Sequence, residues 1–199
     1  MLSENSKFSL PFFVTGIVSG FALIYCWMNV DLFRQLFDSL DKTVFFTANG
    51  WLKGDEKIQY MFAVLNNRAF DIVPGLVILS FLSVIMLKYR DKGYKAVVSV
   101  LGLFIIMCVC SVVISHQILD MGRESPSMVL EPVHKLSELV PSIRAKDESS
   151  RSFPSDHALV LFLFIIFTFK YGGARLGFLA APAIIFALPR LVSGAHWFS

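Results

Sequence analysis

The chain has 199 residues, of which 55% are hydrophobic and only 17% carry a formal charge. Soluble domains usually carry about 25% charged residues, and here the apolar residues are concentrated in long runs, so the composition excludes an ordinary soluble domain and indicates an integral membrane protein. The formal net charge of +3 is too small to indicate a nucleic-acid partner.

Five apolar runs predict five membrane-spanning helices in an all-α, polytopic bundle. We expect these spans at residues 10–28, 72–87, 97–119, 158–171 and 176–192. The first run is interpreted as a retained anchor, because the residues before it are barely basic and no small-residue cleavage site follows it. The three cysteines all lie inside these runs and indicate neither a disulfide framework nor a zinc site.

The region between the first two spans mixes charged and apolar residues. Within 55–71, "DEKIQYMFAVLNNRAFD", apolar residues recur at helical spacing: Ile58, Met61, Phe62 and Leu65. This pattern predicts an amphipathic helix that lies on the membrane surface. Residues 120–156 are expected to form a long polar loop. No internal repeat is visible, so we expect one domain.

Two short basic turns predict the orientation of the bundle. Four basic residues crowd the turn after the second span: Lys88, Arg90, Lys92 and Lys95. Lys170 and Arg175 flank the turn between the last two spans. Because basic residues in short loops favour the cytoplasmic side, both turns and the N-terminus are expected there. Residues 29–71 and 120–156 and the end of the chain then lie on the outer face.

Three polar stretches therefore meet at the outer face. The first, "SFPSDH", opens the fourth span and ends at His157. The second, "PRLVSGAH", closes the fifth span and contains Arg190 and His196. The third, "GRESP", follows the third span and contains Arg123. Together they bring two histidines, two arginines and a helix N-terminus to one membrane surface.

These groups suit phosphoryl transfer on a lipid phosphate. Arginine presents a planar fork of donors that matches phosphate oxygens, and a helix N-terminus offers unpaired N–H groups to anions. One imidazole can attack phosphorus and a second can protonate the departing oxygen. On an unbroken helix, positions 190 and 196 would point roughly 120° apart. We expect Ser193 and Gly194 to break the helix and bring both side chains to one centre.

The same stretches resemble a known family. "FPSDH" and "PRLVSGAH" are similar to the second and third signature motifs of the type 2 phosphatidic acid phosphatase superfamily, which read PSGH and SR-x5-H-x3-D. The resemblance implies that His196 is a nucleophile forming a phosphohistidine and that His157 is the acid. It also implies that Arg123 and Arg190 hold the phosphate, and that neither a metal nor a cofactor is needed.

The rest of the second motif is implied to complete the anion pocket. Ser155 and the N–H groups around it, between Pro154 and Asp156, would contact the phosphate. Asp156 occupies a position where the superfamily usually has glycine. A carboxylate there would repel phosphate unless it points away or pairs with a cation.

Further stretches are similar to one branch of that superfamily, the lipid A 1-diphosphate synthases. They are "LNNRAFD", "RESP", "SFPSDH" and "FALPRLVSGAHWF". The branch implies an inner-membrane enzyme that moves phosphate from undecaprenyl pyrophosphate onto the 1-phosphate of lipid A at the periplasmic face. Within "LNNRAFD", Arg68 either binds a head group or, with Asn66 and Asn67, caps the surface helix.

Two features leave alternatives open. The superfamily's first motif, K-x6-RP, is incomplete around Arg123. The aspartate that orients the nucleophile, and a sixth span, would both follow Ser199, so we expect the sequence to be truncated at its C-terminus. The alternatives are hydrolysis of a polyprenyl pyrophosphate or phosphatidyl phosphate, with water as the acceptor, and an inactive chain that binds lipid or another protein.

Overall fold

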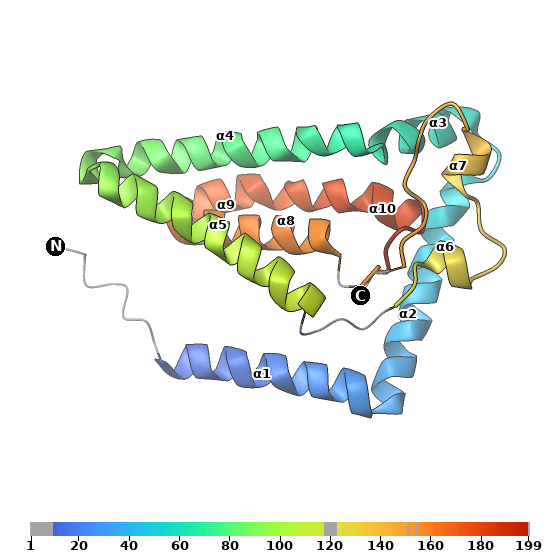
Figure 1. Ribbon diagram of the computed structural model, residues 1–199, viewed down its shortest axis with the longest axis horizontal. Helices are drawn as coiled ribbons and strands as arrows, with labels where there is room; N and C mark the ends of the chain where they lie inside the picture. Colours follow the sequence, from blue (N-terminus) through green and yellow to red (C-terminus); the bar gives the residue numbers. More distant parts are fainter. Residues whose placement is uncertain (1–9, 118–122, 151, 154, 199) are drawn as a thin grey trace. The chain divides into compact units, whose positions relative to one another are not determined.

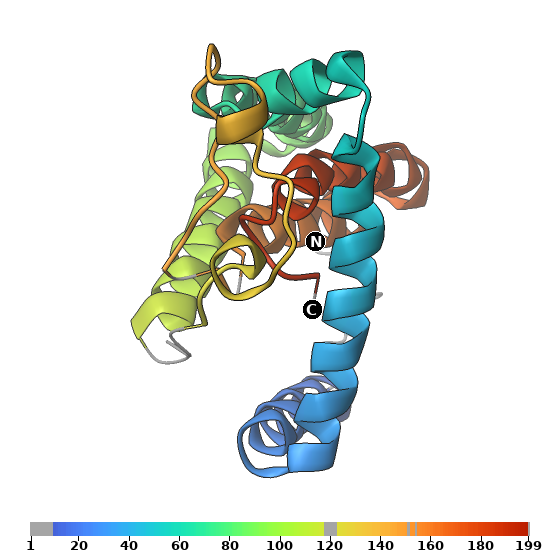
Figure 2. The same cartoon turned by 90° about the vertical axis from the view of Figure 1, so that its right-hand side faces the viewer.

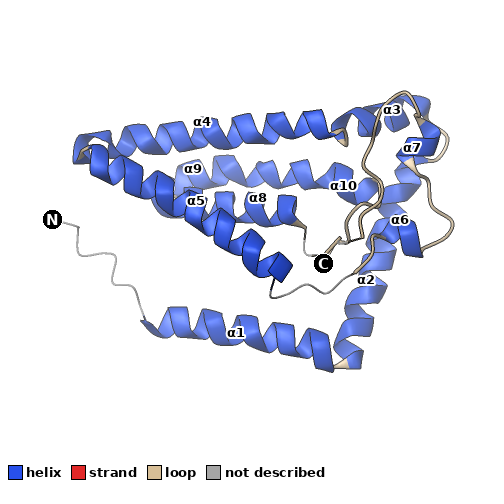
Figure 3. Cartoon of the chain, in the orientation of Figure 1, coloured by secondary structure: helices blue, strands red, loops and turns tan. Residues whose placement is uncertain are grey.

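The computed structural model describes residues 10–117, 123–150, 152–153 and 155–198. Figure 3 shows helices and connecting segments but no strand in this part of the chain. An isolated antiparallel bridge joins Asn67 to Ala145. The chain divides into two compact units, Met1–Thr43 and Val44–Ser199. The predicted all-α class is confirmed.

The first unit contains α1 (Leu10–Asn29) and most of α2 (Asp31–Asn49). α1 coincides with the first predicted apolar run. The sequence analysis did not anticipate α2, whose charged residues interrupt its apolar ones. Two of them form an ion pair one helical turn apart, with Arg34 Nη2 2.8 Å from Asp31 Oδ1.

The second unit contains an antiparallel arrangement of apolar helices (Figure 1). They are α4 (Ile72–Tyr89), α5 (Tyr94–Gln117), α8 (Asp156–Phe167), α9 (Ala174–Ala180) and α10 (Leu188–Val192). A π-helical turn, Thr168–Gly172, extends α8, and a 3-10 segment, Ala181–Ala187, joins α9 to α10. Each predicted span from the second to the fifth coincides with one of these helices or helix pairs.

Three helical stretches among the described residues are long and apolar enough to cross a membrane: Arg68–Lys92, Tyr94–Ile114 and Ala174–Val192. Val18–Trp27 is a shorter apolar helix, and α8 has 12 residues before its π-helical extension. The structure therefore confirms an all-α membrane protein without confirming the count of five spans.

The interior of the bundle is packed with aliphatic and aromatic side chains. Its buried core includes Ile85, Phe104, Phe164 and Phe167. Phe81 packs edge-on against Phe164, with ring centroids 5.5 Å apart. Apolar burial of this kind fixes the positions of the helix ends, where the polar residues lie.

The two basic turns lie together at one end of the bundle. The Lys88 ammonium donates to the carbonyl oxygens of Tyr171 and Gly172, at 3.3 and 3.1 Å. Gly93 and Gly173 reverse the chain there with φ values of 91° and 97°, which favour glycine. The starts of α4 and α8 and the end of α10 are at the opposite end (Figure 1).

That opposite end carries α3 (Glu56–Leu65) and a segment, residues 123–153, that we call the end loop. The end loop contains two one-turn helices, α6 (Pro126–Val129) and α7 (Leu136–Leu139). Figure 2, which faces this end, shows the end loop in front of α8 and α10. A second apolar core joins these parts, with Phe62, Leu136 and Val192 buried. The helix predicted within 55–71 is present as α3, capped by Asp55.

Candidate functional site

The chain reverses direction after α10 through a glycine. Gly194 has φ of 77°, its N–H donates to Leu191, and the next N–H, of Ala195, donates to Arg190. These two bonds make a Schellman ending, which glycine favours because its φ is positive. A Cβ at this position would also lie only 2.9 Å from the Phe45 ring. The predicted helix break is confirmed, and it turns His196 back toward the end loop.

His196 is buried, and the end loop holds its ring. Its exposed fraction is 7%, and Nδ1 lies 2.8 Å from the carbonyl oxygen of Ser152. A carbonyl can only accept, so in the neutral ring Nδ1 carries the proton and Nε2 keeps its lone pair. Among the described residues, the buried Nε2 has no hydrogen-bond partner. The imidazole is thus oriented with its basic nitrogen free.

Burial also keeps His196 neutral. Desolvation lowers the pKa of His196 to about 4, against the opposing effect of its hydrogen bond to Ser152. The positive charges of Lys146 and Arg190, and that of His157 when protonated, contribute to the decrease. At neutral pH the ring is therefore uncharged, which is the state that a nucleophilic imidazole needs.

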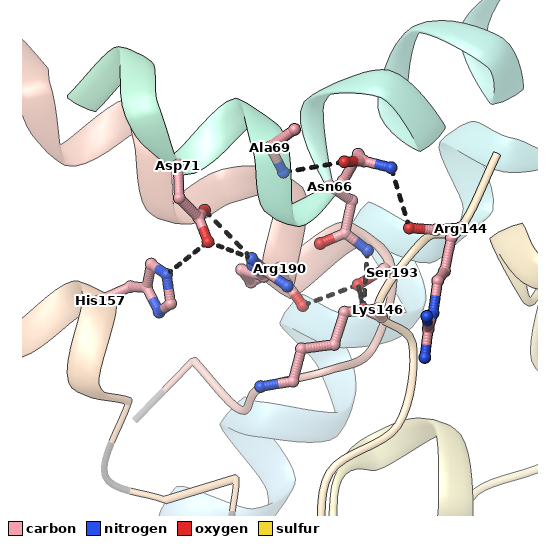
Figure 4. A network of polar contacts seen from close by, with 9 residues as sticks. Asn66, Ala69, Asp71, Arg144, Lys146, His157, Arg190 and Ser193 are labelled. Carbon is pink, nitrogen blue, oxygen red and sulfur yellow. Dashed lines mark hydrogen bonds and ion pairs between the residues drawn. The ribbon is translucent and has the colours of Figure 1, made fainter. Parts of the chain in front are cut away.

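Asp71 connects Arg190 to His157 (Figure 4). Arg190 Nη2 donates to both carboxylate oxygens of Asp71, at 3.1 Å each, and His157 Nε2 lies 3.3 Å from one of the same oxygens. Arg190 is 4% exposed, and its buried Nη1 has no hydrogen-bond partner among the described residues. The carboxylate orients the guanidinium and the imidazole and leaves one guanidinium nitrogen able to bind an anion.

A cleft of about 290 Å³ lies beside this group, and we call it the lipid cleft. Its polar end is formed by Asp71, Asp156, His157 and Arg190. Most of the remaining wall is apolar and includes Ile78, Val160, Leu161 and Phe186. The cleft is apolar along its wall, and its polar end presents a guanidinium and an imidazole together with two carboxylates. An apolar wall that leads to an arginine and a histidine is suited to a hydrocarbon chain that carries a phosphate.

Lys146 of the end loop adds a further positive charge. Partial burial lowers the pKa of Lys146, as do the charges of Arg190 and Arg68, while Asp156 and Asp71 act in the opposite direction. Asp156, where the sequence analysis expected repulsion of phosphate, thus has a cation in its surroundings. Its position in the wall of the lipid cleft does not turn it away from the site.

A comparison with curated proteins gives one clear relative. The chain is 31% identical over 199 aligned positions to lipid A 1-diphosphate synthase of Escherichia coli strain K12, which covers 96% of this chain and 80% of that protein. The chain belongs to the lipid A 1-diphosphate synthase family. No model in the family scan and no solved structure matches it. The branch of the type 2 phosphatidic acid phosphatase-like enzymes that the motifs resemble is confirmed.

The structure brings together part of the set that the synthase family implies. His157, Arg190 and His196 share one end of the bundle, as expected. Arg123 lies close to them, since its carbonyl oxygen accepts from the N–H of Ser152 at 2.9 Å. Its guanidinium carbon is 3.9 Å from the ring centre of Trp197, which is a cation–π contact. The Arg123 side chain is thus stacked beside the nucleophile candidate.

Of the other predicted residues of the synthase motifs, Asp156 lines the lipid cleft and Arg68 does not. Ser155 caps α8, its hydroxyl accepting from the N–H of Ala158 at 3.5 Å, and Asp156 is the first residue of that helix. Arg68 begins a 3-10 turn and lines a different hollow from the lipid cleft. Pro154 lies outside the described residues.

The sequence assigned no role to Asp71 and only an uncertain one to Lys146. Asp71 contacts Arg190 across 119 positions of sequence, and no motif spacing predicts such a pair. Lys146 lies in the charged stretch 144–151, which the sequence favours as a solvated loop, with contact of Arg144, Lys146 and Arg151 to an anionic head group as the alternative. Asp71 is the last residue of "LNNRAFD", one of the stretches similar to the synthases, but that similarity gave it no role. In the described part of the chain, no group of three or more His, Cys, Asp or Glu residues could hold a metal ion.

Proposed function

We propose that the protein is a lipid phosphotransferase that moves a phosphate from undecaprenyl pyrophosphate to the 1-phosphate of lipid A. Membership of the synthase family supports this reaction. The observation that carries the chemistry is His196, buried and neutral, with Nδ1 bound to Ser152 and Nε2 without a partner in the described structure. The lipid cleft and Arg190 next to it supply places for the chain and the phosphate.

In the first half of the proposed reaction, His196 Nε2 attacks the terminal phosphorus of the donor. The N–P bond forms as the bond from phosphorus to the bridging oxygen breaks, and undecaprenyl phosphate leaves. Arg190 stabilises the charge on the phosphoryl oxygens. His157 donates a proton to the bridging oxygen. Because its Nε2 faces Asp71, we assign that proton to Nδ1.

In the second half, an oxygen of the acceptor phosphate attacks the phosphohistidine. The new P–O bond forms, the N–P bond breaks, and the electron pair returns to Nε2 of His196. His157 takes back a proton from the acceptor if the acceptor phosphate carries one. Water in place of the acceptor would make the same site a phosphatase.

We also propose that the site lies on the periplasmic face of the inner membrane. The basic turns around Lys88 and Lys170 lie together at the end of the bundle away from His157 and Arg190. Because short basic loops are retained in the cytoplasm, the end of the bundle that carries His157 and Arg190 would face the periplasm. This arrangement supports the location without relying on the order of the spans.

The test follows the fate of the donor's terminal phosphate. Donor labelled in that phosphate is incubated with the purified protein, with and without lipid A. We expect label to move to lipid A, with little free phosphate released. Release of free phosphate at the same rate in both cases would establish the phosphatase alternative, and no turnover at all would favour a binding role. Activity is expected to survive a chelator; loss that added metal restores would contradict the proposed chemistry.

A further inference from the structure

A second cavity, which we call the polar hollow, has Lys146 in its wall. It measures about 510 Å³ and is lined by Arg68, Arg144, Lys146, Asp147 and Glu148, among others. Its walls come from the turn before α4 and from the end loop. Unlike those of the lipid cleft, its lining residues are polar or charged except for Ala145, which suits a hydrated head group better than a hydrocarbon chain.

The acidic residues of the polar hollow are engaged by other groups. Glu148 Oε1 accepts from the Lys135 ammonium at 2.8 Å. Asp147 is 3% exposed, and its Oδ2 accepts from the N–H of Ser137 at 2.6 Å. These contacts bind one oxygen of each carboxylate inside the end loop. The contacts with Lys135 and Ser137 reduce the ability of the two carboxylates to neutralise the cations that line the hollow.

The basic residues of the polar hollow have no such partners. Within the described residues, no ion pair or side-chain hydrogen bond involves the side chains of Arg68, Arg144 or Lys146. Two guanidinium groups and an ammonium group therefore line one cavity without an ion pair to the described residues. Asp147 and Glu148 line the same cavity, and Lys146 interacts at longer range with Asp156 and Asp71. Phosphate is the ligand that such a set recognises best, since each guanidinium can bind two of its oxygens.

The backbone that carries these cations is firmly held. Asn66 is fully buried and donates to the carbonyl oxygen of Lys146 at 2.7 Å. Asn67 donates to the carbonyl oxygen of Arg144 at 3.2 Å, beside the bridge to Ala145. Ser193, three residues before His196, also donates to Lys146, at 3.2 Å. The hollow is thus tied to the helix that carries Arg190 and to the turn that carries His196.

Lys146 lies between the polar hollow and the transfer site. Its ammonium is close enough to His196 to contribute to lowering that residue's pKa, and it also interacts with Asp71 and Arg190. Figure 4 shows its side chain extending from the end loop to the side on which His157 lies, while Arg144 extends away. A phosphate in the hollow would therefore lie beside Lys146, whose ammonium also interacts with groups of the transfer site.

We propose that the polar hollow binds the head-group phosphate of the acceptor lipid, with Arg68 and Arg144 as its phosphate contacts. The inference rests on the proposed function. The donor's apolar chain fits the lipid cleft, with its phosphate at the end formed by Arg190 and His157. The polar hollow then serves the second phosphate-bearing lipid, and Lys146, which lines the hollow, also interacts with Asp71 and Arg190 of the transfer site.

The test separates the Michaelis constants of the two substrates. Arg68→Ala, Arg144→Ala and the double variant are compared with the unaltered full chain, using undecaprenyl pyrophosphate and lipid A in separate concentration series. Loss of one charge-assisted phosphate contact should raise the KM for lipid A by about tenfold, and more in the double variant, while the KM for the donor does not change. Lys57→Ala, which removes the same charge from an exposed position on α3, is the matched control.

A binding measurement keeps the proposal testable if turnover is absent. Lipid A should raise the melting temperature of the detergent-solubilised chain but not that of the double variant, whereas inorganic phosphate alone should act weakly on both. A raised KM for the donor, or no change in either KM, would overturn the acceptor assignment and leave the transfer reaction intact. If the chain transfers no phosphate to lipid A, the proposed function fails. The thermal shift then tests separately whether the polar hollow binds lipid A. If lipid A does not raise the melting temperature of the parent chain, the acceptor subsite is wrong as well.

Discussion

The helical bundle and the end loop contribute to the site through different contacts. In the bundle, Asp71, His157 and Arg190 stand at helix ends whose positions are fixed by apolar packing. In the end loop, Ser152 and Lys146 are placed by hydrogen bonds between buried side chains and backbone carbonyls. In the proposed reaction, the bundle would supply the groups that act on the phosphate, and the end loop would orient His196 and supply charge around it.

The largest effect should come from the nucleophile itself. His196→Gln retains a polar side chain but cannot form a stable phosphorylated intermediate, so we expect turnover to fall by about a thousandfold or more. Acid quenching after incubation with labelled donor should then yield no labelled protein. His134→Gln is the matched control, because only backbone atoms of His134 bind Asn49. A labelled phosphoenzyme in the His196 variant would remove His196 from the mechanism.

Asp71 should have the next largest effect, because it orients two groups of the bundle at once. Asp71→Asn keeps the shape but removes the charge that faces Arg190 and His157, and we expect turnover to fall by about ten- to a hundredfold. Donor affinity should stay the same or improve, since the carboxylate no longer competes with phosphate for Arg190. The kcat and KM for the donor are measured separately. A rise in kcat would show that Asp71 obstructs the reaction.

Asp55→Asn provides the comparison for that experiment. Asp55 accepts from two N–H groups at the start of α3, and asparagine caps helices about as well as aspartate. Its substitution removes the same charge from the same end of the bundle without touching the site. Equal losses in the two variants would mean that charge alone, and not the contacts of Asp71, causes the effect.

Burial of His196 between bundle and end loop predicts a pH-dependent stability. Its pKa is about 4 in the folded chain against about 6.5 unfolded, so the unfolded state binds more protons between these values. The stabilisation is present above about pH 6.5 and is lost as pH falls toward 4, by at most about 3 kcal/mol. The melting temperature of the parent should fall more steeply over this range than that of His196→Gln. Parallel curves would contradict the burial of a neutral ring.

The sequence predicted the bundle better than the end loop for a physical reason. Long apolar runs mark α4 and α5 to within a few residues, and the break at Gly194 followed from the need to bring Arg190 and His196 together. The position of Lys146 depends on hydrogen bonds to its carbonyl from residues about 50 to 80 positions away, and such bonds leave no periodic pattern in the sequence. α2 was missed because charged residues interrupt its apolar ones, and exposure does not separate the two kinds: Asp41 is buried, whereas Leu32 and Leu36 are exposed.

The smallest predicted effect tests the support of the end loop. Asn66→Ala removes the buried donor to the Lys146 carbonyl, leaving Ser193 as its partner, and should destabilise the chain by about 1–3 kcal/mol. Lys146 would then be less firmly placed, so the KM for lipid A should rise, but less than in Arg144→Ala. Asn67→Ala is the comparison, because that side chain is partly exposed and its bond to Arg144 is longer. If Asn66→Ala instead lowered kcat as strongly as Asp71→Asn, the end loop would take part in the chemical step and the division of roles between loop and bundle would be wrong.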